Sequence, residues 1–413
     1  MATIVFDNAR IFDGHLAECA EGASLLVEGG LIREIADRPI RVGGEARRID
    51  AAGRTLMPGL IDLHTHAYAS HVDVARIEAA GEAYRASHAH RMLGHALDCG
   101  FTTLRDVGGG DWSLWRAIEE GLVRAPRWFY AGKALSMTGG HGDMRHASEE
   151  GCDCCACGEV NSFCVIADGV DECLKAVREE LRRGAHCIKI MGSGGVASPT
   201  DPIWMNQYRE DEIRAIVGEC AERRTYVTAH CHPTSAIRRC VDFGVRVIEH
   251  GTLIDEETAR FVAERGAYVV PTMATIFALK ELGAMLGFPA ASQAKMEIAH
   301  AAALKGLEIM KKAGVKLGYG TDLLGETYVQ ECREFELRRE VFSPLEILRQ
   351  ATSNSAEILM QEGDLGCIAP GAHADLILVE GDPLSDIGLL AANGEKLALV
   401  MRAGEIVKDR LTA

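Results

Sequence analysis

Two patterns of hydrophobic and polar positions divide the chain. Near its start, "TIVFDNARIFDG", "ASLLVEGGLIREIA" and "ARRIDAAGRTLMPG" are short alternating runs interrupted by Gly, Asn and Asp, which is typical of strands joined by turns. The end of the chain repeats this pattern in "LGCIAPGAHADLILVEGDPL" and "KLALVMRAGEIVKD". Neither end is long enough to bury a core alone. We therefore expect residues 1–57 and 360–413 to pair into one small β-sandwich domain.

Between these ends, over residues 58–359, short apolar runs alternate with helical patterns such as "VDECLKAVREELRRG" and "DEETARFVAERG", each of which ends at a glycine. The expected strands are Leu60–His66, Thr102–Arg105, Arg127–Ala131, Cys187–Met191, Tyr226–His230, Val245–His250, Tyr268–Thr272 and Lys316–Asp322. Eight strand–helix units predict an α/β fold of the (β/α)8 TIM-barrel type. An open doubly wound sheet is the alternative, but no Gly-rich dinucleotide fingerprint follows the first strand.

Composition and charge narrow the class of partner. Hydrophobic residues make up 47% of the chain, enough for a sizeable core, and the net charge of −16 disfavours nucleic acid as a partner. The opening "MATIVFDNARIFDG" lacks the features of a signal peptide, and no apolar run is long enough to cross a bilayer. We therefore expect a cytoplasmic protein that acts on a small molecule.

The 14 cysteines suit a reduced, cytosolic chain, and most of them are scattered singly. The exception is "CDCCACGEVNSFC", which contains Cys152, Cys154, Cys155, Cys157 and Cys164. This segment is either a structural zinc site or a thiol-rich loop that shapes the mouth of the site. Its spacing is tighter than that of the usual paired zinc knuckles.

Metal-ligating side chains end several of the expected strands. In "PGLIDLHTHAY", His64 and His66 are two residues apart, so both point to the same side of a strand. The other strand ends carry Lys189, His230, His250 and Asp322. Because the active site of a barrel lies at the carboxyl ends of its strands, this set predicts a metal centre at the barrel mouth.

Lys189 has two interpretations. As an ammonium group, lysine is a poor metal ligand. In a dry pocket beside metal ions its amine can instead add CO₂, and the resulting carbamate has two oxygens that can bridge two cations. The alternative is a buried Lys189 paired with Asp322.

These residues and several longer motifs resemble the amidohydrolase superfamily over nearly the whole chain. Within it, "SMTGGHGD", "IKIMGSGGVASPTDP", "IEHGTLIDEETARFVAERGAYVVPT" and "GTDLLGE" are most similar to prolidase-like metal-dependent dipeptidases and Lys/Arg carboxypeptidases.

The resemblance implies a role for each residue of the predicted metal centre. Two divalent ions, with zinc expected, are held by His64, His66 and Asp322 at the inner site and by His230 and His250 at the outer site. Carboxylated Lys189 and a hydroxide bridge the ions. Asp322 acts as general base and then as general acid.

The resemblance also suggests substrate contacts, each with a simpler alternative. His141 would hydrogen-bond the substrate carbonyl or organise its loop, and Arg145 would pair with a substrate carboxylate or lie in solvent. Tyr208 would line the mouth or pack on the next helix. His232 stands where the relatives tend to have a substrate-holding tyrosine, so it either replaces that tyrosine or signals a different substrate.

The implied activity is hydrolysis of a C–N bond, favouring dipeptides or N-acyl amino acids, with ureas or carbamates as the alternative. A non-catalytic binding module is the contrasting hypothesis, which the presence of all six metal positions disfavours. Enzymes of this kind often assemble, so we expect a homo-oligomer.

Overall fold

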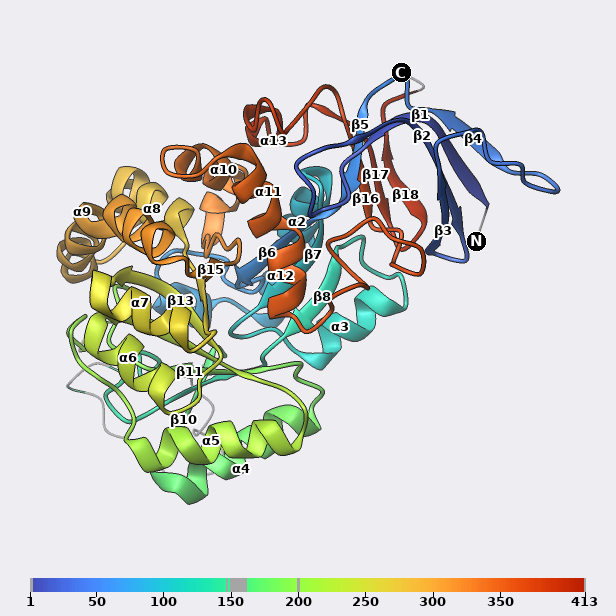
Figure 1. Ribbon diagram of the computed structural model, residues 1–413. Helices are drawn as coiled ribbons and strands as arrows, with labels where there is room; N and C mark the ends of the chain where they lie inside the picture. Colours follow the sequence, from blue (N-terminus) through green and yellow to red (C-terminus); the bar gives the residue numbers. More distant parts are fainter. Residues whose placement is uncertain (1–2, 146–147, 149–161, 199–200, 412–413) are drawn as a thin grey trace.

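The fold combines parallel sheets wrapped by helices with a sheet built from the two ends of the chain (Figure 1). It is known from a computed structural model, which describes residues 3–145, 148, 162–198 and 201–411. Both ends of the chain lie at the terminal sheet, at one side of the molecule.

In the part of the chain that the structure describes, ten parallel strands in two sheets form what we call the parallel half of the molecule. The larger sheet contains, in spatial order, β10 (Cys164–Ile166), β9 (Ala134–Ser136), β11 (Ile188–Met191), β12 (Val227–Pro233), β13 (Val247–Leu253), β14 (Tyr268–Val270) and β15 (Lys316–Leu317). The smaller sheet contains β6 (Leu60–Thr65), β7 (Phe101–Asp106) and β8 (Arg127–Tyr130). Every residue of β6 and β7 is buried, as expected of parallel strands covered on both faces.

The parallel α/β architecture is confirmed, but the two sheets do not close into one continuous ladder as a complete barrel would. The third expected strand, Arg127–Ala131, is observed as β8, which pairs with β7, whereas β9 was not predicted and pairs with β11 beyond Gly132, whose φ is +73°. Single backbone bonds join the sheets at this gap, where the His186 amide donates to the Tyr130 carbonyl at 2.8 Å.

The last expected strand, Lys316–Asp322, was predicted too long, because β15 ends at Leu317. Beyond it the chain follows β6 by irregular bonds. The Leu63 amide donates to the Tyr319 carbonyl at 2.9 Å, and the Asp322 amide donates to the His64 carbonyl at 2.8 Å. This irregular segment carries Asp322 directly beside the end of β6.

Helices cover the outer faces of the parallel strands (Figure 1). In the described part of the chain they are α1 (Val74–Ala79), α2 (Glu82–Asp98), α3 (Trp112–Glu119), α4 (Gly169–Arg182), α5 (Glu210–Glu222), α6 (Thr234–Asp242), α7 (Glu256–Glu264), α8 (Met273–Leu286), α9 (Ala290–Ala313), the 3-10 helix η1 (Gly325–Gln330), α10 (Arg333–Arg338), α11 (Pro344–Ala351), α12 (Ser353–Ile358) and α13 (Gly388–Ala391). None of these described helices combines the length and the apolar character needed to cross a membrane.

Strands from both ends of the chain form one eight-stranded sheet, so the expected pairing of the two ends is observed as a single sheet. Its strands are β18 (Glu405–Asp409), β17 (Leu397–Arg402), β16 (Leu376–Val379), β5 (Thr55–Pro58), β1 (Ile4–Ile11), β2 (Ala20–Glu28) and β3 (Leu31–Ala36) in spatial order, with β4 (Arg47–Asp50) paired to β1. The two ends meet where β5 pairs antiparallel with β16.

This terminal sheet is buried on both faces where it meets the parallel strands. Along β16, Leu376 and Leu378 pack in a core on one face of the terminal sheet, the terminal core. Ile377 and Val379 instead belong to the main core, that of the parallel half. Because alternate side chains of a strand point to opposite faces, β16 joins the two cores. The division at residues 57/58 and 359/360 stays a prediction.

Candidate functional site

A cavity of about 140 Å³ opens at the carboxyl ends of the parallel strands. All six predicted metal positions line it, together with His141 and His232: His64, His66, His141, Lys189, His230, His232, His250 and Asp322. Its other walls are largely apolar, formed by side chains that include Ile77, Phe163, Val196, Ile276 and Phe288. The cavity therefore places a dense polar cluster against a hydrophobic wall.

Two sets of side chains lie close enough to share a metal ion. The ligating atoms of His64, His250 and Asp322 lie within 4.8 Å of one another, and so do those of His230, His232 and His250. His250 belongs to both sets, which therefore adjoin. The Oδ1 atom of Asp322 lies 3.4 Å from His64 Nε2 and 3.3 Å from His66 Nε2.

Hydrogen bonds at Nδ1 orient the imidazoles. His64 Nδ1 lies 2.7 Å from Glu249 Oε2, and His66 Nδ1 lies 2.9 Å from the Gly108 carbonyl oxygen. His250 Nδ1 lies 2.8 Å from the Thr272 hydroxyl. A partner at Nδ1 leaves Nε2 available as a ligand, which is the usual arrangement of metal-binding histidines.

The residues of the site fit a divalent cation. His230 Nε2 is buried and has no hydrogen-bond partner among the described residues, although a buried polar atom is costly when it is unsatisfied. Burial lowers the pKa of His64 to about 4 and that of His232 to about 3, and it lowers the pKa of His230 as well. These three imidazoles are thus neutral at pH 7, the form that binds metals, whereas the Asp322 carboxylate outweighs burial at His66 and raises its pKa.

Backbone conformation at the strand ends is unusual. His250 and Asp322 have φ values of +69° and +56°, in the left-handed region that non-glycine residues seldom adopt. Gly195 is required for a different reason. A Cβ atom there would lie 2.3 Å from His141 Cε1 and 2.6 Å from His230 Nε2, so any side chain would displace the imidazoles.

Sequence analysis missed the residues that support the cluster. Glu249 is fully buried. Its Oε1 accepts a hydrogen bond from Arg105 Nη2 at 2.5 Å, and its Oε2 is hydrogen-bonded to His64 Nδ1. Arg105, also fully buried, donates from Nε to the Leu63 carbonyl at 2.7 Å. Charged residues inside the apolar runs "TTLRD" and "VIEHG" were the available signal, since buried charges require partners.

His141 lies on the loop after β9 and faces the cavity. Its ring stacks on that of His230 with centroids 4.2 Å apart, and its Nδ1 lies 2.8 Å from the Ser198 hydroxyl. Asp201 Oδ2 lies 3.5 Å from the same nitrogen. This support holds the ring in place beside the cluster, as its predicted contact with the substrate requires.

The structure separates the other three predicted substrate contacts. His232 lines the cavity, and its Nδ1 lies 3.2 Å from the Thr252 hydroxyl. Arg145 does not line it, because its guanidinium makes a two-pronged pair with Asp143 at 2.7 and 2.5 Å. Tyr208 is buried in the main core, away from the cavity lining. Of the cysteine-rich segment, Cys152–Cys157 lies outside the described residues, whereas Cys164 is buried in β10 and lines the cavity.

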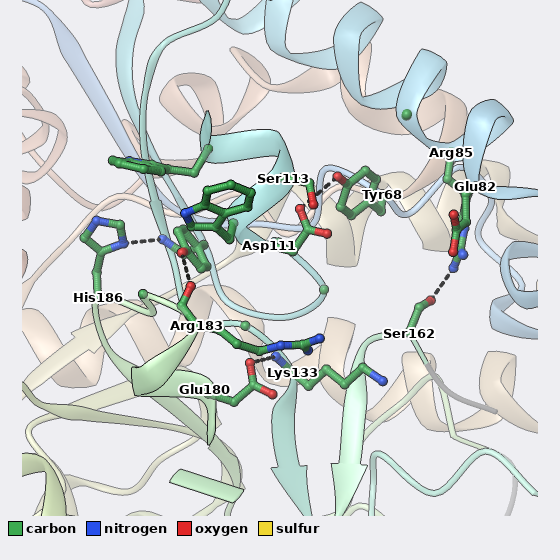
Figure 2. A pocket seen from close by; sticks show the side chains of 18 of the residues that line it. Tyr68, Glu82, Arg85, Asp111, Ser113, Lys133, Ser162, Glu180, Arg183 and His186 are labelled. Carbon is green, nitrogen blue, oxygen red and sulfur yellow. Dashed lines mark hydrogen bonds between the residues drawn. The ribbon is translucent and has the colours of Figure 1, made fainter. Parts of the chain in front are cut away.

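A second and larger cleft, of about 1090 Å³, lies beside the histidine cavity and contains none of its metal positions (Figure 2). Tyr68 lines this cleft, where its hydroxyl donates to Asp111 Oδ1 at 3.2 Å. Across the cleft, Glu180 accepts a bond from the Lys133 amide at 3.2 Å. Gly108 and Gly109 lie between the histidine cavity and this cleft. The Gly108 carbonyl oxygen bonds His66 Nδ1 on one side, and Gly109 lines the cleft on the other.

The sequence model of the amidohydrolase family matches residues 55–407. The chain belongs to the amidohydrolase family. It is 34% identical to ochratoxinase of Aspergillus niger over 349 residues, which cover 80% of this chain and 71% of that protein. This places the chain among hydrolases. The amidohydrolase family generally uses divalent metals, which agrees with the prediction of a metal centre.

Two crystal structures are similar over 99% of this chain and 100% of theirs. One is an amidohydrolase with 47% identity and a TM-score of 0.97. The other is a prolidase in complex with N-methylphosphonate-L-proline, with 45% identity and a TM-score of 0.96. The predicted resemblance to prolidase-like amidohydrolases is thereby confirmed.

Proposed function

We propose that this amidohydrolase cleaves the amide bond of dipeptides or N-acyl amino acids at a binuclear metal centre. The observation that carries the proposal is the single cavity in which neutral, buried imidazoles meet Lys189 and Asp322 against an apolar wall. Divalent ions bound there would supply Lewis acidity and a water with a lowered pKa.

The residues divide into two ligand sets that share Lys189. His64, His66 and Asp322 would hold one ion, and His230 and His250 would hold the other. Zinc suits this combination of imidazole and carboxylate ligands. His232 lies close enough to His230 and His250 to be an additional ligand. We assign it to the substrate because it stands where prolidase-like relatives tend to have a substrate-holding tyrosine.

Lys189 is suited to carboxylation. Its side chain is 2% exposed, and burial lowers the pKa of its amine, which favours the neutral form. The neutral nitrogen attacks the carbon of CO₂ and loses a proton, which leaves a carbamate with one negative charge. That charge would offset part of the charge of two divalent ions in the buried site.

Asp322 is placed to move the proton. Burial raises the pKa of its carboxyl group, but the neighbouring His64 and His66 imidazoles more than offset this, so its pKa lies below the usual value. It is therefore a carboxylate at pH 7, able to accept a proton from the attacking water and to deliver it to the leaving nitrogen. His141, held by Ser198, would donate a hydrogen bond to the oxygen of the scissile carbonyl.

The apolar wall favours a substrate with an uncharged, hydrophobic part. Ile77, Phe163 and Phe288 would bury such a group, whereas a charged side chain would lose its hydration there without gaining a partner. The similar prolidase is in complex with N-methylphosphonate-L-proline, whose tetrahedral phosphorus resembles the tetrahedral intermediate of amide hydrolysis. The relation to ochratoxinase keeps a xenobiotic substrate, including the ureas and carbamates, as the second candidate.

A parallel substrate screen tests the proposal. Zinc-loaded protein would be assayed against dipeptides, N-acyl amino acids, phenylureas and carbamates, with the His250→Ala variant as the control for contaminating hydrolases. We expect turnover of amides with apolar acyl groups and none by the variant. Turnover confined to the ureas or carbamates would replace the proposed substrate class with the second candidate.

A further inference from the structure

A second cluster of metal-ligating side chains lies away from the catalytic cavity. The ligating atoms of His95, Cys99 and Glu331 lie within 4.8 Å of one another. Cys332 follows Glu331 in the chain, and its thiol is hydrogen-bonded to the thiol of Cys99. None of these four residues lines the catalytic cavity. The cluster therefore brings together one nitrogen, one sulfur and a carboxylate, with the Cys332 thiol beside that sulfur.

The geometry is close to that of a tetrahedral zinc site. His95 and Cys99 are one helical turn apart on α2, so both project from the same face of the helix. His95 Nε2 lies 3.5 Å from Cys99 Sγ. Nitrogen and sulfur ligands on one tetrahedral zinc ion are separated by about 3.6 Å, given ordinary zinc–ligand bond lengths.

A buried oxygen atom of Glu331 gives an independent indication that a cation binds here. Its side chain is 4% exposed, and its Oε1 atom is buried without a hydrogen-bond partner among the described residues. Even a neutral acid leaves Oε1 unsatisfied, which is costly in a core.

The sulfurs are equally buried, since Cys99 is 2% exposed and Cys332 is fully buried. Zinc binds the thiolate form of cysteine, so binding of the ion would release the thiol proton.

We propose that His95, Cys99 and Glu331 bind a structural zinc ion, with Cys332 beside them, separate from the catalytic metals. Cys99 ends α2, just before β7 begins at Phe101, so this site lies at the amino end of the strand and opposite the catalytic mouth. That end of a barrel serves stability. The ion would fasten the end of α2 to the start of α10, two elements far apart in the chain.

Cobalt substitution tests this proposal without reference to activity. Metal-free protein would be loaded with Co²⁺ and its near-ultraviolet absorption recorded, because a sulfur-to-cobalt charge-transfer band requires thiolate ligands. The proposed catalytic ligands are nitrogen and oxygen atoms, so they give no such band. We expect the band in the wild-type protein, its loss in Cys99→Ala, and its retention in Cys220→Ala, which removes another buried helical cysteine.

A second variant covers the case in which Cys99→Ala fails to fold. Glu331→Gln keeps both thiols and the side-chain shape, and we expect it to weaken cobalt binding at least tenfold in a titration followed at the same band. Absence of the band in wild-type protein, an undiminished band in Cys99→Ala, or unchanged affinity in Glu331→Gln would each overturn the proposal. The result is independent of the proposed function, because neither outcome depends on hydrolysis.

Discussion

The carboxylate of Asp322 contacts His64, in β6, and His66, which follows that strand. The left-handed backbone at Asp322 and the bond from its amide to the His64 carbonyl fix its side chain between the two imidazoles. A carboxylate held in this way can stay ionised in a buried site and exchange protons without rearrangement. Its proposed role as general base and acid can be isolated by an isosteric substitution.

Asp322→Asn is expected to lower kcat about 10³-fold with little change in KM, since it removes proton transfer while preserving shape. Steady-state kinetics on the substrate found by the screen provide the measurement, with metal content determined in parallel. Asp364→Asn, at an exposed position, serves as the control. A kcat within threefold of wild type would exclude Asp322 from proton transfer.

Arg145→Met separates two roles for this residue. If Arg145 binds the carboxylate of a dipeptide, the variant raises KM about tenfold for dipeptides and leaves the corresponding amides that lack a carboxylate unaffected. If its pair with Asp143 only organises the His141 loop, both kinds of substrate lose efficiency equally. We expect the second outcome, because Arg145 pairs with Asp143 and does not line the cavity. Arg209→Met, at a side chain that is 83% exposed, controls for the lost surface charge.

Residues of the cavity differ in how readily the sequence predicts them. His64 and His66 follow directly from a two-residue spacing at the end of an apolar run. Glu249 and Arg105 bond each other across 144 positions of sequence, so their partnership depends on the tertiary fold that brings β7 and β13, which belong to different sheets, together. Tyr208 and Arg145 were selected from loop motifs, which do not specify where a side chain points.

At the scale of elements, α10 anchors the segments that follow β14 and β15, the second of which leads to Asp322. Arg338 is fully buried, bonds Glu334 at 2.7 Å and donates to the carbonyl oxygens of Pro271 and Gly318, at 2.8 and 2.9 Å. These carbonyls follow β14 and β15. A short helix therefore satisfies the irregular backbone that succeeds both strands.

Arg338→Met is expected to reduce the free energy of unfolding by about 3–5 kcal/mol, because it leaves Glu334 and two carbonyl groups buried without their partner. Denaturant titration followed by circular dichroism measures this loss. Arg238→Met is the matched control, since its pair with Glu257 is exposed and contributes at most about 1 kcal/mol. Equal losses in the two variants would contradict the anchoring role.

The alternation of strands and helices made most elements predictable, but their lengths and breaks were not. β15 is short because Gly318 and Gly320 allow the chain to approach β6 and leave the ladder. At Gly318, a Cβ atom would lie 2.7 Å from Leu63 Cδ1. That close approach is a tertiary contact, which an apolar run of seven residues does not reveal.

At the scale of the whole molecule, strands of the terminal sheet contribute side chains both to the terminal core and to the main core of the parallel half. On β5, Leu56 packs in the terminal core and its neighbour Met57 packs in the main core. We therefore expect the protein to unfold as one cooperative unit in spite of its size. The pairing of the two chain ends was predictable from their similar patterns, whereas this joining of cores required the structure.

Leu56→Ala tests this coupling. The variant should lose about 2–5 kcal/mol of stability from the emptied core position. Thermal loss of ellipticity and of catalytic activity should shift together to lower temperature, although Leu56 lies outside the cavity. Leu16→Ala, at a residue that is 61% exposed, should shift neither. Loss of ellipticity without loss of activity would show that the terminal sheet unfolds separately.

The central claim is that hydrolysis depends on metal ions held by the histidine cavity. The most direct test is the rate of hydrolysis of an N-acyl amino acid or dipeptide by metal-free protein, before and after addition of Zn²⁺ and bicarbonate. The account predicts no measurable turnover without metal and full recovery on addition, with no recovery in His250→Ala. Equal turnover by folded metal-free protein, or recovery in the variant, would contradict it.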